Sequence, residues 1–378
     1  MNKKIIFLTG TRADFGKLKP LIEKIENSDS FDCYIFVTGM HTLSKYGSTY
    51  LEIQKGNYQN IFVYMNQTHT TDSDIILANT VIGFSNFVKE IIPDMIVIHG
   101  DRIESLAGAI VGSFNNILVS HIEGGEVSGN LDEMLRHSTT KLSHIHFVSN
   151  EQAKNRLLHM GEENDSIFVI GSPDIDIMTS KTLPTINTVK SRYDITFDKF
   201  SILIFHPVTT EFENLQIQIN DVVSAVIESN QNFVVIFPNN DKGNEIILNE
   251  YKRFKFNQHF KIFPSLRFEY FLTLLKNSDL ILGNSSVGIR ESEIYGVASI
   301  NIGNRQKVRS NNKNIVNVEP DKLSILTAME KLLGQKIPTT FEFGKGNSSE
   351  KFYEILIDHK IWKTPHQKYF KDFQQDIL

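Results

Sequence analysis

The chain has 378 residues, of which 40% are hydrophobic and 22% are charged, and its formal net charge is −5. This length exceeds what one hydrophobic core usually supports, so we expect two domains. The acidic balance argues against a general nucleic-acid-binding protein, which normally carries a basic patch. The single cysteine, Cys33, excludes an internal disulfide framework and fits a reducing, cytoplasmic compartment. No apolar run approaches about 18 residues, so no membrane span is expected.

The first half of the chain alternates short apolar runs with amphipathic segments. Runs typical of buried strands recur at 5–9, 34–38, 95–99, 117–121, 145–149 and 167–170. Helical patterns lie between them, for example at 18–26, 75–90 and 104–114. Such alternation is typical of a parallel sheet with helices on both faces.

The second half repeats this pattern after a weakly patterned segment at 173–200. Strands are expected at 201–205, 233–237, 260–263, 280–283 and 298–302, and helices at 215–229, 267–277 and 289–295. We therefore expect an α/β fold of two Rossmann-like domains that face each other across a cleft. The first domain is expected at 1–172 and the second at 173–360. Amphipathic patterns at 350–361 and 367–373 predict helices at the end of the chain, and we assign 361–378 as a C-terminal helix.

Acidic residues stand at the ends of predicted strands or open a predicted helix. Asp101 follows the strand at 95–99, Glu123 follows the strand at 117–121, and Asp132 or Glu133 precedes a helical run. Strand ends of a parallel sheet converge on one rim, where ligands bind. Crowded carboxylates repel one another, so at least one is expected to hold its proton near neutral pH, which suits general acid–base catalysis.

The alternative for these acids is helix capping. Asp101 could cap the helix that begins near residue 103, and Asp132 or Glu133 could cap the next helix. Glu123 lies in a Glu-Gly-Gly-Glu turn and has no helix to cap at once. Three such acids together favour a catalytic site over three separate caps.

Two turns have the residue types that bind phosphate. The first, at 10–17, carries Arg12 and Lys17 at the start of a predicted helix, although it is neither Gly-x-Gly-x-x-Gly nor a Walker loop. An ordinary polar turn is an equally good interpretation there. The second turn, at 283–291, joins a strand to a helix through glycine and serine, and Glu291 could accept from ribose hydroxyls. A serine helix cap is the alternative.

The second domain has two further candidate positions. His206 ends the strand at 201–205 and would lie at the rim of the second sheet, although a lone histidine there is more often structural. Arg305, Lys307 and Arg309 add three cations after the strand at 298–302, which favours a nucleotide diphosphate site. His144 and His146 have no partners at ligand spacing, so we expect no metal site.

Several of these motifs together resemble the UDP-N-acetylglucosamine 2-epimerases, and more closely their hydrolysing branch, which forms N-acetylmannosamine for bacterial sialic acid synthesis. The resemblance runs over nearly the whole chain and rests on the motifs at 9–14, 38–41, 100–102, 121–126, 136–137, 205–207, 283–286 and 303–306. It implies the two-Rossmann-domain "GT-B" architecture, with the C-terminal helix packed back on the first domain. It also implies elimination of UDP to 2-acetamidoglucal, followed by addition of water with inversion at C2.

The resemblance also implies roles for individual residues. Asp101, Glu123 and Asp132 would be the catalytic acids, with Glu133 as the neighbouring alternative to Asp132. His206 would lie near the diphosphate and the sugar, His41 on the sugar side, and Glu291 on the ribose. The remaining positions are expected to bind phosphate or other parts of the substrate: Arg12, Lys17, Arg102, Arg136, Gly283, Asn284, Ser285, Ser286, Gly288 and Arg305.

The resemblance implies no cofactor and no metal. The expected partner is a small nucleotide-sugar substrate, with no nucleic acid or membrane, and the chain is expected to form a homo-oligomer, a dimer or tetramer. Competing functions are hydrolysis of a UDP- or GDP-linked 2,4-diacetamido sugar of the legionaminic acid pathway, a non-hydrolysing epimerase, a GT-B glycosyltransferase and a non-catalytic nucleotide-sugar sensor.

Overall fold

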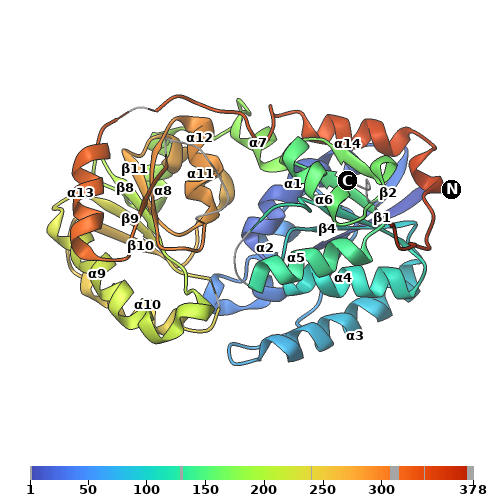
Figure 1. The fold of residues 1–378 in the computed structure, drawn as a ribbon, viewed down its shortest axis with the longest axis horizontal. Coiled ribbons are helices and arrows are strands. Elements are labelled where there is room, and N and C mark those ends of the chain that lie inside the picture. Colours follow the sequence, from blue (N-terminus) through green and yellow to red (C-terminus); the bar gives the residue numbers. More distant parts are fainter. Residues whose placement is uncertain (1, 128–130, 240, 307–314, 336, 373–378) are drawn as a thin grey trace, which may run out of the picture. The chain divides into compact units, whose positions relative to one another are not determined.

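The computed structural model describes residues 2–127, 131–239, 241–306, 315–335 and 337–372 (Figure 1). The chain divides into two compact units. The first unit takes its described residues from Met1–Glu126, Asp132–Thr179 and Glu342–Leu378, and the second from Val127–Leu131 and Ser180–Phe341. No helix in the described part of the chain is both long and apolar enough to cross a membrane.

The first unit contains a seven-stranded sheet in which all neighbouring strands run parallel. Its spatial order is β3-β2-β1-β4-β5-β6-β7. The bounds are β1 (Lys3–Thr9), β2 (Phe31–Val37), β3 (Ile61–Val63), β4 (Met95–His99), β5 (Leu118–Ile122), β6 (Ile145–Val148) and β7 (Ile167–Val169). The inner strands are mostly buried and mostly apolar, and hydrophobic clusters cover both faces of the sheet.

Helices connect these strands and form the two outer layers. They are α1 (Arg12–Glu26), α2 (Tyr50–Gln54), α3 (Ser73–Ile91), α4 (Ile103–Phe114), α5 (Leu131–Leu142), α6 (Glu151–His159) and α7 (Pro173–Met178). The chain returns to this unit with α14 (Ser348–Ile357), which packs against α1 and α7. Phe352 and Leu356 of α14 are fully buried in the core beside Phe7.

The C-terminal segment differs from the prediction. Of the described residues after α14, only Ile361–Lys363 are helical, as a single 3-10 turn. The helix expected at 361–378 is therefore wrong for its described part, and residues 373–378 lie outside the described residues. Tertiary contacts replace it: His366 O accepts from His144 Nε2 at 3.0 Å, and Lys368 Nζ lies 2.5 Å from Glu162 Oε2.

The second unit repeats the architecture with a six-stranded parallel sheet in the order β10-β9-β8-β11-β12-β13. The strands are β8 (Ser201–Ile204), β9 (Phe233–Ile236), β10 (Phe260–Phe263), β11 (Leu280–Gly283), β12 (Ala298–Ile302) and β13 (Ile315–Val318). The helices are α8 (Ile186–Tyr193), α9 (Leu215–Glu228), α10 (Asn244–Glu250), α11 (Phe268–Lys276), α12 (Glu291–Tyr295) and α13 (Lys322–Leu332). The fold class is thus α/β, as the sequence predicts.

Candidate active site

Two acidic residues lie side by side at the carboxyl edge of the first sheet. Asp101 follows β4 and Glu123 follows β5, and these strands are paired neighbours. Arg136 of α5, only 3% exposed, joins them. Its Nη1 donates to Glu123 O at 3.0 Å, and its Nη2 donates to the Asp101 carboxylate. One buried guanidinium therefore brings these two predicted acids together.

Arg102, and not Asp101, is the N-cap residue of α4, and its own side chain makes no cap hydrogen bond. The Asp101 carboxylate accepts from Arg136. Glu123 has a φ of 61°, in the left-handed region that costs a non-glycine residue on the order of 1 kcal/mol. The fold thus holds Glu123 in a strained backbone conformation at the site.

The other two predicted acids open α5. Glu133 lies 3.4 Å from His137, one helical turn further along. Asp132 precedes Arg136 by one helical turn, and Arg136 is the residue that contacts both Asp101 and Glu123. Because residues four apart share a helix face, Asp132 is on the face of Arg136, whereas Glu133 is on the face of His137. This arrangement favours Asp132 as the third acid.

The Glu123 carboxylate is almost dry and is surrounded by donors. Its Oε1 accepts a hydrogen bond from Ser172 Oγ. Its Oε2 lies 3.1 Å from His99 Nε2 and 3.6 Å from Lys17 Nζ. Lys17, a predicted phosphate ligand, thus contacts a carboxylate of the acid cluster. Its phosphate role stays a prediction.

His99 lies between two carboxylates. Its Nδ1 is 3.5 Å from Asp14 Oδ1, and its Nε2 faces Glu123. Burial by itself lowers the pKa of His99, but the neighbouring charges of Glu123 and Asp14 raise that pKa to about 9. The His99 ring is therefore an imidazolium at neutral pH.

Sequence reasoning missed four residues of this cluster: Asp14, His99, Ser172 and Asp174. His99 ends β4 and Ser172 comes shortly after β7, so the strand-end rule could have found these two, whereas Asp14 and Asp174 lie inside α1 and α7. Asp174 was hidden by its position in the segment interpreted as a linker. That segment instead begins with α7, which belongs to the first unit.

The three remaining predicted residues of the first unit have mixed surroundings. His41 is 1% exposed, and its Nδ1 lies 2.6 Å from Thr49 Oγ1. Burial lowers the pKa of His41 to about 4, so its ring is neutral. Arg12 Nη2 lies 2.7 Å from Glu52 Oε1, and Arg102 Nε lies 3.8 Å from Glu104 Oε2. Their substrate contacts stay predictions.

In the second unit, Asn284 links the ends of β8 and β11. Its Oδ1 accepts from His206 N at 2.7 Å, and its Nδ2 donates to His206 O at 2.9 Å. His206 Nδ1 accepts from Asn239 N at 3.0 Å, which fixes the ring. The structure therefore brings His206 to the predicted phosphate turn.

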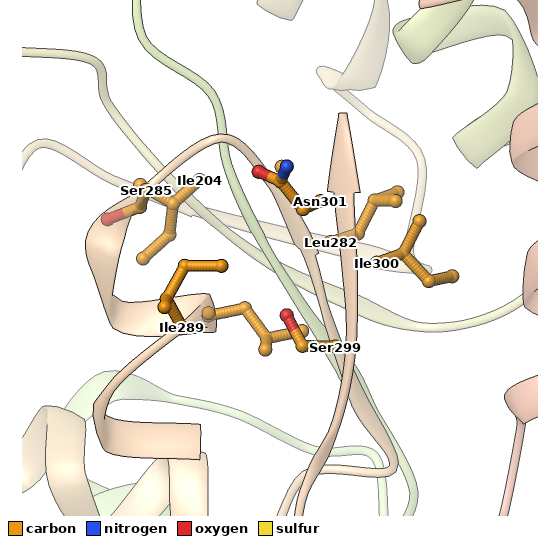
Figure 2. Close-up of a pocket in the computed structure, with 10 residues that line it drawn as sticks. Ile204, Leu282, Ser285, Ile289, Ser299, Ile300 and Asn301 are labelled. Carbon is orange, nitrogen blue, oxygen red and sulfur yellow. The ribbon is translucent and has the colours of Figure 1, made fainter. Parts of the chain in front are cut away.

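The turn itself is tightly packed. A Cβ on Gly283, which has a φ of 138°, would lie 1.8 Å from Ile204 O, so only glycine fits there. Ser285 Oγ accepts from Val287 N at 3.4 Å, and a single 3-10 turn runs from Ser286 to Gly288. Figure 2 shows the small pocket at this turn, where the polar atoms of Ser285, Ser299 and Asn301 stand among apolar side chains.

Arg305 lies at the same turn. Its Nη1 donates to Asn284 O at 3.2 Å, so the guanidinium is fixed beside the glycine–serine segment. Glu291 opens α12 and is 2% exposed. Lys307 and Arg309, the other two predicted cations, lie outside the described residues.

Comparisons with known proteins agree over almost the whole chain. Residues 23–357 match the family model described as UDP-N-acetylglucosamine 2-epimerase. A UDP-N-acetylglucosamine 2-epimerase of Neisseria meningitidis is 45% identical over 374 residues, which cover 98% of this chain and 99% of the relative. A UDP-N,N'-diacetylbacillosamine 2-epimerase (hydrolyzing) of Legionella pneumophila is 35% identical over 94% of this chain and 96% of its own.

A solved structure gives the same fold. The UDP-GlcNAc 2-epimerase of Methanocaldococcus jannaschii in complex with UDP-GlcNAc and UDP matches with a TM-score of 0.79 and 25% identity. The match covers 94% of this chain and 99% of that chain. The two parallel sheets with interleaved helices are thus those of the GT-B fold.

Proposed function

The chain belongs to the UDP-N-acetylglucosamine 2-epimerase family, and from this premise we propose that it is a hydrolysing 2-epimerase. It converts UDP-N-acetylglucosamine and water to N-acetylmannosamine and UDP through 2-acetamidoglucal. The observation that carries the proposal is that Asp101 and Glu123 follow neighbouring parallel strands, with Arg136 bonded to the Asp101 carboxylate and to the Glu123 carbonyl. This arrangement supplies carboxylates for proton transfer, which an epimerisation at C2 requires.

The proposed reaction has two steps. In the first, a carboxylate removes the proton from C2 while the bond between C1 and the diphosphate oxygen breaks, which yields 2-acetamidoglucal and UDP. In the second, the oxygen of water adds to C1 and a proton returns to C2 on the opposite face, which yields N-acetylmannosamine. The C2 proton is weakly acidic, so Asp101, Glu123 and Asp132 are proposed as the groups that move it.

Departure of UDP builds negative charge on the diphosphate. Fixed cations and backbone amides stabilise such charge most when they are already in place. Arg305 and the turn of Ser285 and Ser286 are proposed for this role in the second unit, together with His206 beside them. Glu291 is proposed to accept from the ribose hydroxyls.

The hydrolysing mode is supported by the name of the Legionella pneumophila relative, which is a hydrolysing 2-epimerase. That relative also motivates a second candidate, hydrolysis of a UDP-linked 2,4-diacetamido sugar. In the first case the product would supply sialic acid synthesis, and in the second it would supply a related diacetamido sugar acid.

A proton NMR time course with UDP-N-acetylglucosamine tests the proposal. Free N-acetylmannosamine and UDP are the expected products, and in deuterated water the product should carry deuterium at C2. UDP still attached to an epimerised sugar would show a non-hydrolysing enzyme. No turnover with this substrate, but release of free sugar from the diacetamido nucleotide sugar, would favour the second candidate.

A further inference from the structure

Five charged side chains form a nearly dry network at the carboxyl edge of the first sheet. Asp14 and Lys17 come from α1, His99 from the end of β4, Glu123 from the end of β5 and Asp174 from α7. With His99 protonated, the network holds three carboxylates and two cations. In such a dry site each charge strongly affects the proton affinity of its neighbours.

Lys17 is shared between two of the carboxylates. Its Nζ lies 3.1 Å from Asp174 Oδ2 and 3.6 Å from Glu123 Oε2. The Asp174 side chain is only 2% exposed and that of Lys17 is 12% exposed. The ammonium therefore lies nearer to Asp174 than to Glu123, and Asp174 reduces its effect on the Glu123 carboxylate.

The helix that carries Asp174, α7, also contacts the other carboxylate oxygen of Glu123. Ser172, the N-cap residue of α7, donates its hydroxyl to Glu123 Oε1. The helix is fixed in turn by Asp176, whose carboxylate accepts from the backbone N–H groups and hydroxyls of Ser348 and Ser349 at 2.7 to 2.9 Å. Asp174 and Asp176 are thus two buried or half-buried carboxylates on one helix with different contacts.

We propose that Asp174 is a positioning residue that sets, through Lys17, the charge state of the Glu123 carboxylate. This inference rests on the proposed function, in which Glu123 moves a proton. Three groups lie against the Glu123 carboxylate: Lys17 of α1, His99 at the end of β4 and Ser172 at the N-cap of α7. Further charges act through these or through the backbone: Asp14 through His99, Asp174 through Lys17, Arg136 through the Glu123 carbonyl and Asp101 through Arg136.

The direction of the effect follows from the charges. Asp174→Asn removes an anion and leaves the whole charge of Lys17 to Glu123, so Glu123 holds its proton less tightly. Ser172→Ala removes a donor to the ionised carboxylate, so Glu123 holds its proton more tightly. The two variants should therefore shift the titration of Glu123 in opposite directions.

The pH profile of turnover tests this. The limb governed by Glu123 should move to lower pH in Asp174→Asn, by on the order of one pH unit, and to higher pH in Ser172→Ala, with KM nearly unchanged in both.

Asp174→Glu, which restores the charge, should return the profile towards that of the wild type. Asp176→Asn is the matched control, because it should lower the melting temperature and leave the profile in place. If Asp174→Asn does not fold, Asp174→Ser removes the same charge, and the same shift of the profile to lower pH is expected.

A measurement without substrate separates this inference from the proposed function. Carbon-13 NMR of side-chain-labelled glutamate, with the Glu123 signal assigned through Glu123→Gln, follows the titration of Glu123 directly. The expected result is the same pair of opposite shifts, even in a protein that does not turn over UDP-N-acetylglucosamine. A Glu123 titration in Asp174→Asn that matches that of the wild type, or that of Asp176→Asn, would overturn the inference.

Discussion

At the scale of single residues, the site depends on Arg136. Asp101 and Glu123 follow neighbouring strands, and Arg136 pairs with the carboxylate of the first and with the backbone of the second. A guanidinium suits this position because its planar fork can donate in two directions at once, here to a carboxylate and to a backbone carbonyl. A lysine ammonium could not reproduce this geometry.

The first prediction concerns the three acids. Asp101→Asn, Glu123→Gln and Asp132→Asn should each lower turnover by a factor of ~10² or more and leave UDP affinity nearly intact. The amides keep the size of the side chain but cannot carry a proton to and fro. Steady-state kinetics and calorimetry with UDP measure the two effects separately.

Glu133→Gln is the matched control for these variants. Glu133 is next to Asp132 in the first turn of α5 but pairs with His137, so turnover should stay close to that of the wild type. If Glu133→Gln is inactive and Asp132→Asn is active, the third catalytic acid is Glu133 and not Asp132. Activity in all four variants would contradict the proposed acid cluster.

The second prediction concerns the cation of the second unit. Arg305→Ala should weaken UDP binding more than it lowers turnover at saturating substrate, because Asn284 O fixes the guanidinium at the turn that is proposed to bind phosphate. Calorimetric titration with UDP measures the affinity. Arg253→Ala, which removes a cation paired with Glu250 elsewhere in the same unit, should leave the affinity unchanged. Equal UDP affinity in wild type and Arg305→Ala would refute the assignment.

At the scale of elements, strand ends and the turns after them were the most predictable features. The bounds of β4, β10, β11 and β12 coincide with the apolar runs in the sequence. Three of these, β4, β11 and β12, are inner strands, and buried parallel strands are apolar on both faces. Two edge strands, β3 and β13, were missed, whereas the edge strands β7 and β10 were predicted. β3 has only three residues, and none of them is fully buried.

The contacts of the site were less predictable than its location. The sequence predicts that Asp101 and Glu123 share a rim, because this follows from the register of adjacent parallel strands. It does not predict that Lys17 contacts Asp174 or that Ser172 reaches Glu123, because these contacts depend on how α1 and α7 pack. Residues 367–372 show the converse case, in which tertiary contacts of Lys368 override a short helical pattern.

The third prediction concerns the turn after β11. Gly283→Ala should lower the free energy of unfolding of the second unit by roughly 2–4 kcal/mol, because the new Cβ would meet Ile204 O and the backbone conformation suits only glycine. Urea denaturation measures the change. Gly303→Ala is the control, because Gly303 also has a positive φ but a Cβ there would meet nothing within 4 Å. That variant should lose only about 1 kcal/mol. Equal losses in both variants would show that the contact with Ile204 O is unimportant.

At the scale of the whole molecule, one architecture occurs twice, and the repeated strand–helix alternation predicted this. The chain leaves the first unit after Thr179, later than the expected domain boundary at residue 172, because α7 packs on α1 of the first unit. The two units also differ in their buried ionisable groups. His41, His121 and His144 all belong to the first unit, and burial lowers the pKa of these histidines to about 4, 3 and 4.

The fourth prediction follows from these histidines. Each is neutral in the folded first unit, whereas in the unfolded chain each takes up a proton below its ordinary pKa of 6.5. Below pH 6.5 the unfolded state therefore binds more protons, and stability should fall by on the order of 1 kcal/mol per histidine for each pH unit. Burial lowers the pKa of His146 as well, so it acts in the same direction.

Two other groups of the first unit do not offset this loss. The pKa of His99 is raised, so its contribution to stability is fully present below pH 6.5 and is lost only as the pH rises towards about 9. Although burial raises the pKa of Glu162, hydrogen bonds from His146 and Lys141 and the charge of Lys368 lower it to about 2. Its contribution is therefore retained down to pH 4.5, the ordinary value, and is lost below that.

Scanning calorimetry between about pH 7 and pH 5 should thus show the melting transition of the first unit move to lower temperature while that of the second unit moves less. His144→Gln removes one of the three histidines and should reduce the slope for the first unit, whereas His259→Gln in the second unit should leave that slope unchanged. The buried histidines would not be the cause of the acid sensitivity if both transitions moved in parallel, or if His144→Gln and His259→Gln gave the same slope.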